Sequence, residues 1–153
     1  MTKGACAFLL VIALWTAPVP AANRGARAEL IGGTVADLAN GTSGHIIVTG
    51  EQAMIFQCKG ISMEIPFERI NTLEYGQRVG RRYAGAILVS PLLLLSKTRK
   101  HFVTVGYTDN DGKQQALVFR VDKDDVRAML ASLEAKSGRK VEFQDDEARK
   151  TRG

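Results

Sequence analysis

The fold is decided by residues 103–138, which read VTVGYTDNDGKQQALVFRVDKDDVRAMLASLEAKSG. Apolar residues occupy every second position at Val103, Val105 and Tyr107, and again from Leu117 to Val121, which is the period of a half-buried strand. Between the two runs lies an acidic segment that contains glycine and is a strong turn signal. The stretch therefore predicts an antiparallel hairpin.

A helix is expected directly after this hairpin. Asp122 suits the N-terminal cap, and Gly138 suits the C-terminal cap. The apolar residues between them stand at i, i+3, i+4 and i+7 and form one stripe, made of Val126, Met129, Leu130 and Leu133. We expect this stripe to be buried against a sheet.

The preceding residues also predict strands. Ile61, Met63 and Ile65 alternate with polar residues, and Pro66 marks the end of that strand because it cannot donate a ladder hydrogen bond. Further strands are expected at residues 45–48, 54–58, 70–75 and 141–143. Residues 22–43 are rich in glycine and predict an N-terminal arm, of which 27–38 forms either a strand or an irregular segment. Residues 145–153 predict a charged tail.

The first residues have the layout of a secretory signal. A basic start at Lys3 precedes an apolar run from Ala5 to Trp15, and Val19 and Ala21 are small residues at −3 and −1 of a cleavage site. The run is well short of the roughly 20 residues that span a bilayer. We therefore expect a signal peptide over 1–21 and an exported protein, periplasmic or secreted. An uncleaved membrane anchor is the alternative.

Charge is distributed unevenly along the expected domain. No acidic residue lies between Glu74 and Asp109, although the net charge of the chain is only +5. A local positive field of this kind favours an anionic partner. Nucleic acid is not expected as that partner, because the chain is exported and contains no recognised binding motif.

Within this acid-free stretch, residues 83–95 form an apolar run that Pro91 interrupts. We expect a short, mainly helical insertion around 80–96. Basic residues flank it on both sides, so the candidate membrane or partner contacts are Arg78, Arg81, Arg82, Tyr83, Leu92, Leu93, Leu94, Leu95, Lys97, Arg99 and Lys100. Three interpretations stay open: contact with an anionic membrane surface, a protein or self-association surface, and packing of the run into the core with its charges solvated.

The sequence contains no pattern that predicts catalysis. The two histidines, His45 and His101, are far apart in sequence and accompany no nucleophile motif. Cys58 lies in an apolar run and is expected to be a small buried hydrophobe. Asp109 and Asp111 lack the further ligands of a calcium loop. We therefore expect no enzyme activity, no metal and no cofactor.

A short local pattern carries a family resemblance. The segment from Ile61 to Ile70, read as ISMEIPFERI and followed by Leu73-Glu-Tyr75, resembles a strand-to-strand step of bacterial pleckstrin-homology-like (PH-like) and GRAM-like domains. The span from about 44 to 142 is also similar to a group of uncharacterised exported bacterial proteins. The resemblance implies an α+β, mainly β domain over 44–144. That domain would be a curved antiparallel sheet or partly open barrel of about 6–7 strands, closed by one C-terminal amphipathic helix. Ile70 would pack at the corner.

These expectations lead to one functional hypothesis and one alternative. The hypothesis is a non-catalytic exported binding module that contacts a membrane surface or another anionic partner through residues 78–101. The alternative is a structural or self-associating protein that uses the apolar run as a protein interface.

Overall fold

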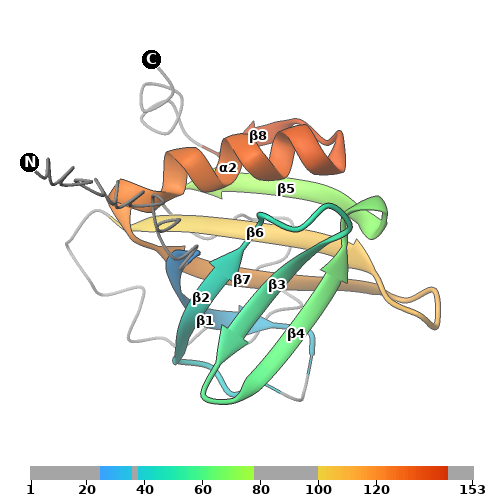
Figure 1. Ribbon diagram of the computed structural model, residues 1–153, viewed down its shortest axis with the longest axis horizontal. Helices are drawn as coiled ribbons and strands as arrows, with labels where there is room; N and C mark the ends of the chain where they lie inside the picture. Colours follow the sequence, from blue (N-terminus) through green and yellow to red (C-terminus); the bar gives the residue numbers. More distant parts are fainter. Residues whose placement is uncertain (1–24, 36–37, 78–99, 145–153) are drawn as a thin grey trace, which may run out of the picture.

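The computed structural model describes residues 25–35, 38–77 and 100–144. Over these residues the chain forms a curved, mostly antiparallel sheet that does not close, with one helix across its open side (Figure 1). The strand order is β4-β3-β2-β1-β7-β6-β5-β8. The strands are β1 (Ala26–Gly33), β2 (Thr42–Ile47), β3 (Ala53–Cys58), β4 (Ile61–Pro66), β5 (Ile70–Gly76), β6 (His101–Thr108), β7 (Gln114–Val121) and β8 (Val141–Phe143). The mainly β prediction is confirmed, but the sheet has eight strands instead of the expected 6–7.

The additional strand is β1, which lies within residues 22–43. Sequence patterning assigned these residues to an N-terminal arm outside a domain at 44–144, with a strand as one option. The structure places β1 inside the sheet, where it pairs antiparallel with both β2 and β7. Its buried residues on one face include only two alanines and one leucine, Ala26, Ala28 and Leu30. A central strand with such small side chains gives a weak period-two signal, so the pattern alone did not distinguish it from an arm.

The predicted hairpin is confirmed, and β3 and β4 form a second one. In β6 and β7, Val103 pairs with Phe119 and Val105 with Leu117, so the alternating apolar residues face one core. Between β3 and β4, Lys59 and Gly60 both have positive φ angles, 39° and 83°. Glycine reaches such angles without strain, which explains the turn there.

The chain turns a corner between β4 and β5. Pro66 ends β4, and a short 3-10 helix, η1 (Phe67–Arg69), carries the chain to Ile70. The Phe67 amide donates to the carbonyl oxygen of Gln52 at 2.9 Å, while the side chains of Phe67 and Ile70 are buried. Ile70 therefore packs at the corner, the position that the family resemblance implied for it. The 3-10 turn itself was not anticipated.

Helix α2 (Lys123–Ser137) covers the open side of the sheet, and its predicted stripe is buried. Burying each of these four side chains stabilises the fold by about 1.5–3 kcal/mol. Asp122 occupies the N-cap position but makes no side-chain capping bond. Instead, Asp125 accepts a hydrogen bond from the amide of Arg27 at 3.0 Å, which ties the first turn of α2 to β1. Gly138 ends the helix in the left-handed conformation, as expected.

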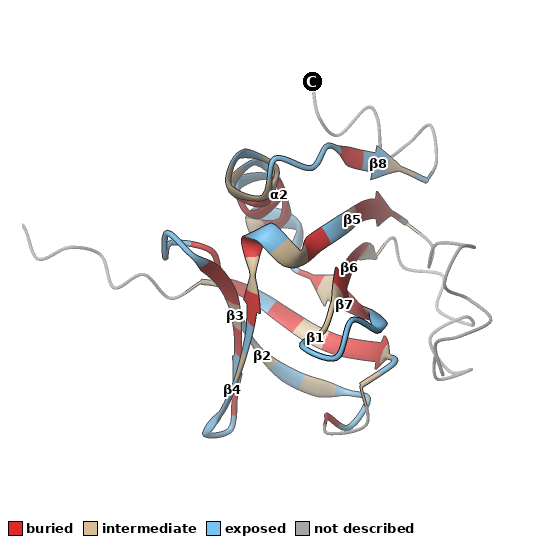
Figure 2. Ribbon diagram, turned by 90° about the vertical axis from the view of Figure 1, so that its right-hand side faces the viewer, coloured by how far each residue is buried: buried red, intermediate tan, exposed pale blue. Residues whose placement is uncertain are grey.

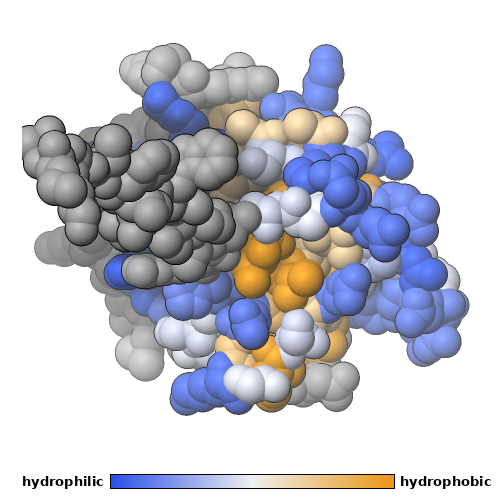
Figure 3. All heavy atoms as spheres, in the orientation of Figure 1, coloured by the Kyte–Doolittle hydropathy of each residue, from blue (hydrophilic) through white to orange (hydrophobic). Residues whose placement is uncertain are grey.

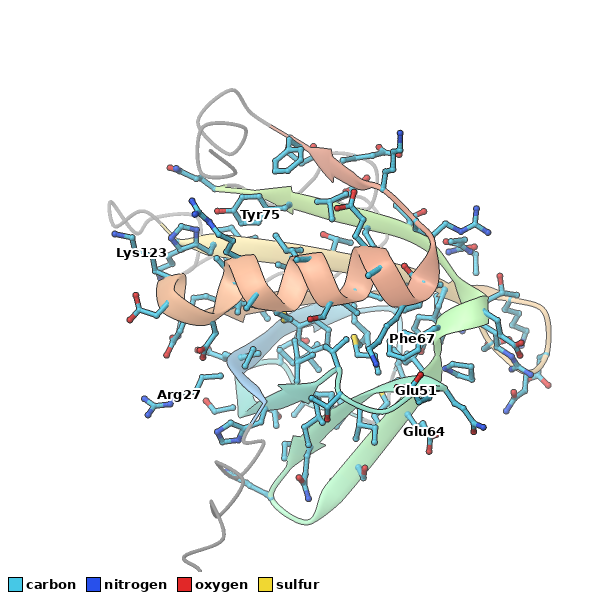
Figure 4. All side chains as sticks on the ribbon, turned by 45° about the horizontal axis from the view of Figure 1, so that its top comes forward. Arg27, Glu51, Glu64, Phe67, Tyr75 and Lys123 are labelled. Carbon is cyan, nitrogen blue, oxygen red and sulfur yellow. The ribbon has the colours of Figure 1, made fainter. Side chains whose placement is uncertain are left out.

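The C-terminal end of α2 also makes contacts that hold it on the sheet. Lys136 Nζ donates to the carbonyl oxygen of Gly50 at 2.7 Å and lies 5.8 Å from the centre of the Phe67 ring. Arg139 donates to the carbonyl oxygen of Ile70 at 3.2 Å. Figure 4 shows Phe67 and Glu51 near this end of the helix. The helix is thus fixed at both ends to separate parts of the sheet.

Four predictions concern segments outside the described residues: the signal peptide over 1–21, the membrane anchor as its alternative, the helical insertion around 80–96 and the charged tail over 145–153. They stay predictions. Among the described residues, no helix combines the length and the apolar character needed to cross a membrane.

The substitution Leu133→Ala tests the role of α2, because the Leu133 side chain is 0% exposed. We expect the free energy of unfolding to fall by about 2–5 kcal/mol, since the lost transfer free energy and the remaining cavity both destabilise the fold. Urea denaturation measures this change. Ala131→Ser, on the exposed side of the same helix, is the control and should change the value by less than about 0.5 kcal/mol. Equal stabilities of the two variants would contradict the covering role of α2.

Candidate functional site

The sequence-predicted contact residues fall almost entirely on one segment outside the described residues. Lys100 is the exception and lies directly before β6, partly exposed. The structure therefore tests neither the membrane contact nor the packing of the apolar run. It does show what surrounds Lys100 at the end of the segment.

Lys100 lines one of two adjoining hollows near the first turn of α2. The hollow beside it has a volume of about 530 Å³, and the neighbouring one has a volume of about 630 Å³. The two share Arg120 and Asp122 and together form what we call the basic groove. Its charged and histidine residues are Arg27, Glu29, His45, Lys59, Lys100, His101, Arg120, Asp122 and Lys123.

The strand pairing brings these groove residues together from distant parts of the chain. Arg27 pairs with His45 across β1 and β2, and Glu29 pairs with Arg120 across β1 and β7. Successive side chains of a strand point to opposite faces, so all four lie opposite the buried alanines and leucines of the core. Figure 4 shows Lys123 at the first turn of α2 and the Arg27 side chain pointing away from the helix. Apart from Lys100, sequence reasoning did not bring these residues together, because they are scattered over β1, β2, β6, β7, α2 and the segments between them.

One glycine allows the close approach of strands at the groove. A Cβ atom added at Gly44 would lie 2.3 Å from the carbonyl oxygen of Gln57 and 2.9 Å from the Cβ of Cys58. No larger residue fits at this position without moving the backbone of β3. Gly44 therefore shapes the floor of the hollow formed by β1, β2 and β3.

The groove carries an excess of positive charge. Five of its side chains are cationic and two are carboxylates, which leaves a formal excess of three positive charges. One carboxylate, Glu29, forms an ion pair with Arg120. The other cations come from four separate elements or loops and converge here. An anion in the groove would thus be attracted from several sides.

His101 occupies the inner wall of the groove, where it contacts the core. Its Nδ1 atom and the Tyr75 hydroxyl are 2.6 Å apart, and the two rings are stacked with 6.0 Å between their centres. Burial lowers the pKa of His101 below its ordinary value of 6.5, and the nearby charge of Lys123 lowers it further. The imidazole is therefore held neutral at neutral pH and can accept a hydrogen bond from Tyr75.

The other residues considered for chemistry have structural roles. Cys58 is buried in the core, which confirms the interpretation of this residue as a small hydrophobe. Asp109 accepts hydrogen bonds from the amides of Asp111 and Lys113, both at 2.9 Å, and from the Gln115 side chain at 2.8 Å. These bonds hold the hairpin turn and lower the pKa of Asp109. Among the described residues, no three His, Cys, Asp or Glu side chains are grouped so that they could hold a metal ion.

Comparison of the sequence with known families gave no matching family model, and comparison with curated proteins gave no matching sequence.

The lowered pKa of His101 predicts a pH-dependent stability. The unfolded chain has the ordinary histidine pKa of 6.5, so below about pH 6.5 it binds more protons than the folded chain does. The stability contributed by the neutral ring is complete above this pH and is lost as the pH falls toward the folded pKa. We expect the Tm of the wild type to drop more between pH 8 and pH 5 than that of His101→Gln.

The other histidine provides the control for this measurement. His45 is exposed on β2, and His45→Gln should show the same drop in Tm as the wild type. If His101→Gln also showed the full wild-type drop, the neutral His101 would not be responsible for the effect.

Proposed function

We propose that the chain is an exported, non-catalytic binding module of PH-like type that holds a phosphate-bearing anion in the basic groove. The residues 78–101 predicted as the contact segment end at this groove, because Lys100 and His101 line it. The convergence of five cations from β1, β7, the start of α2 and two connecting segments is the observation that carries the proposal.

The arrangement of elements supports the PH-like part of this proposal. The resemblance implied a curved antiparallel sheet whose open side is covered by a C-terminal helix. The described chain has a sheet that does not close, with α2 buried across it. Ile70 is fully buried at the corner where the resemblance places an isoleucine. In Figure 1 the strands β2, β3 and β4 run steeply across the direction of β5, β6 and β7.

The chemistry of the groove favours a phosphate group over an uncharged ligand. Lysine and arginine both bind phosphate, lysine as a compact charge and arginine through a planar fork of donors. The groove contains both types, in Lys100, Lys123 and Arg27. A basic residue close to an anionic membrane surface contributes about 1 kcal/mol to binding. A lipid headgroup and a soluble phosphate compound share this chemistry, and binding experiments can distinguish them.

Self-association is a second candidate, favoured by the edge of the sheet. β4 is an edge strand, and Ile61 at its start is the large hydrophobic residue that stands 53% exposed. Unpaired backbone groups at an exposed edge can pair with a second copy. Figure 3 also shows hydrophobic side chains in the middle of one face, surrounded by hydrophilic ones.

If β4 is such an interface, Ile61→Lys should shift sedimentation-velocity profiles from dimer to monomer, independently of salt.

Removing the two lysines nearest the contact segment tests the groove. We expect the double variant Lys100→Ala, Lys123→Ala to bind vesicles containing phosphatidylglycerol about thirtyfold more weakly than the wild type, which corresponds to about 2 kcal/mol. Binding should also weaken as salt rises. Co-sedimentation of the chain, as isolated from the expressing cell, measures both effects.

The matched control removes the same charge away from the groove. Lys113 lies at the hairpin turn and Lys140 follows α2, and both are exposed. Their double alanine variant should lose less than threefold in affinity. Equal losses in both double variants would indicate general charge attraction and reject the groove. Competition by soluble glycerol phosphate, measured in the same assay, would identify the phosphate group as the recognised chemistry. If soluble glycerol phosphate did not compete, the vesicle surface would be identified as the ligand.

A further inference from the structure

The sheet has a second buried face that the core does not include. Side chains on the outside of β1, β5, β6 and β7 are between 0 and 6% exposed, although they point away from the side that α2 covers. We call this set the outer apolar face: Ile31, Glu74, Phe102, Thr104, Ala116 and Val118. Figure 2 shows buried stretches in red along these strands.

The alternation along each strand establishes the orientation of these residues. Val103 and Val105 belong to the core cluster, so Phe102 and Thr104 face the other way. Leu117 and Phe119 likewise belong to the core, which places Val118 outside. Strands of an antiparallel sheet commonly leave one face to solvent, whereas β6 and β7 are buried on both. The outer apolar face must therefore be covered.

No described helix or strand covers this face. Helix α2 packs on the opposite side, and β8 extends the sheet edge by pairing with β5. The connection between β5 and β6 begins and ends beside the face, because Gly76 at the end of β5 pairs with Phe102 near the start of β6. A hairpin between neighbouring antiparallel strands needs only about 2–5 residues. Here residues 77–100 separate the strands, and 83–95 among them are apolar.

The basic residues of this connection also suit a buried carboxylate on the outer apolar face. Glu74 is 1% exposed and lies opposite Thr104, in a row that continues to Val118. A carboxylate is stable in such surroundings only close to a cation. Three arginines, Arg78, Arg81 and Arg82, follow Glu74 closely along the chain, and the connection contains no acidic residue.

We propose that residues 78–99 of the same chain lie on the outer apolar face as a second core layer, with an arginine of that segment against Glu74. The leucines at 92–95 then stabilise the domain and are not a membrane anchor. The segment delivers Lys100 and His101 to the basic groove, where the contact with an anion takes place. This inference concerns the second layer and does not depend on what binds in the groove.

Thiol labelling of single cysteines tests the proposal in the full chain. Each of Leu92, Leu93, Leu94 and Leu95 is replaced by cysteine in a chain whose Cys6 and Cys58 are alanine. The chain is kept dilute and free of lipid, and labelling by a charged maleimide is followed over time. We expect at least two of the four to react tenfold or more slowly than Ile61→Cys, which is exposed on β4. Circular dichroism and Tm confirm that each variant is folded.

Three other outcomes would overturn the proposal. Four labelling rates equal to that of Ile61→Cys would place the leucines in solvent. Protection that increases with protein concentration would indicate a second copy on the face. Protection that requires phosphatidylglycerol vesicles would indicate a membrane contact.

The proposed contact between Glu74 and an arginine has a separate test. Adding Glu74→Gln to a protected cysteine variant should raise its labelling rate at least threefold, because the arginine loses its buried partner. Glu64→Gln, at an exposed position of β4, is the matched control and should leave the rate unchanged. If Glu74→Gln had no more effect than Glu64→Gln, the arginine contact would be excluded even if the leucines were protected.

Discussion

The structure depends on one helix covering the apolar opening of a curved sheet. A sheet that curves without closing leaves buried side chains accessible at its open side, and the stripe of α2 removes them from water. Contacts at the two ends of the helix determine its position. The Arg27 backbone and Asp125 hold the first turn on β1, while Lys136 and Arg139 hold the last turn on the β2–β3 loop and on β5. Moving the helix would therefore disturb both halves of the sheet at once.

Sequence patterning predicted the elements whose apolar residues are large and regularly spaced. The hairpin of β6 and β7, the stripe of α2 and the closing strand at Val141 are of this kind. The sequence pattern was a weaker guide to β1, where packing depends on small side chains. It also did not predict the 3-10 turn at Phe67, where one backbone hydrogen bond holds the chain. Of the groove only Lys100 was predicted as a contact residue, because residues such as Arg27 and Arg120 approach each other only through the sheet order.

The outside of the sheet is divided into two regions of opposite character. At the groove, outward residues of β1, β2 and β3 such as Arg27, His45 and Gln57 are charged or polar. Over β5, β6 and β7 several outward residues are buried, among them Phe102, Val118 and the polar Glu74 and Thr104. The same outward direction is thus open to solvent at the groove and buried over the other strands. Arg120 lies at the boundary, beside Phe102 in β6 and paired with Glu29 in β1. The connection between β5 and β6 begins and ends near this boundary, since Gly76 pairs with Phe102.

The central position of β1 has a consequence for the order of folding. Glu29 and Arg120 are 91 positions apart in sequence, and β1 cannot pair on its second side until β7 is available. Contacts between such distant residues require closing a long loop and slow the search for the native state. One edge of β1 therefore stays unpaired until β7 has formed beside it. The two halves of the sheet therefore join through a pairing between opposite ends of the described chain, and we expect this pairing to be a late step in folding.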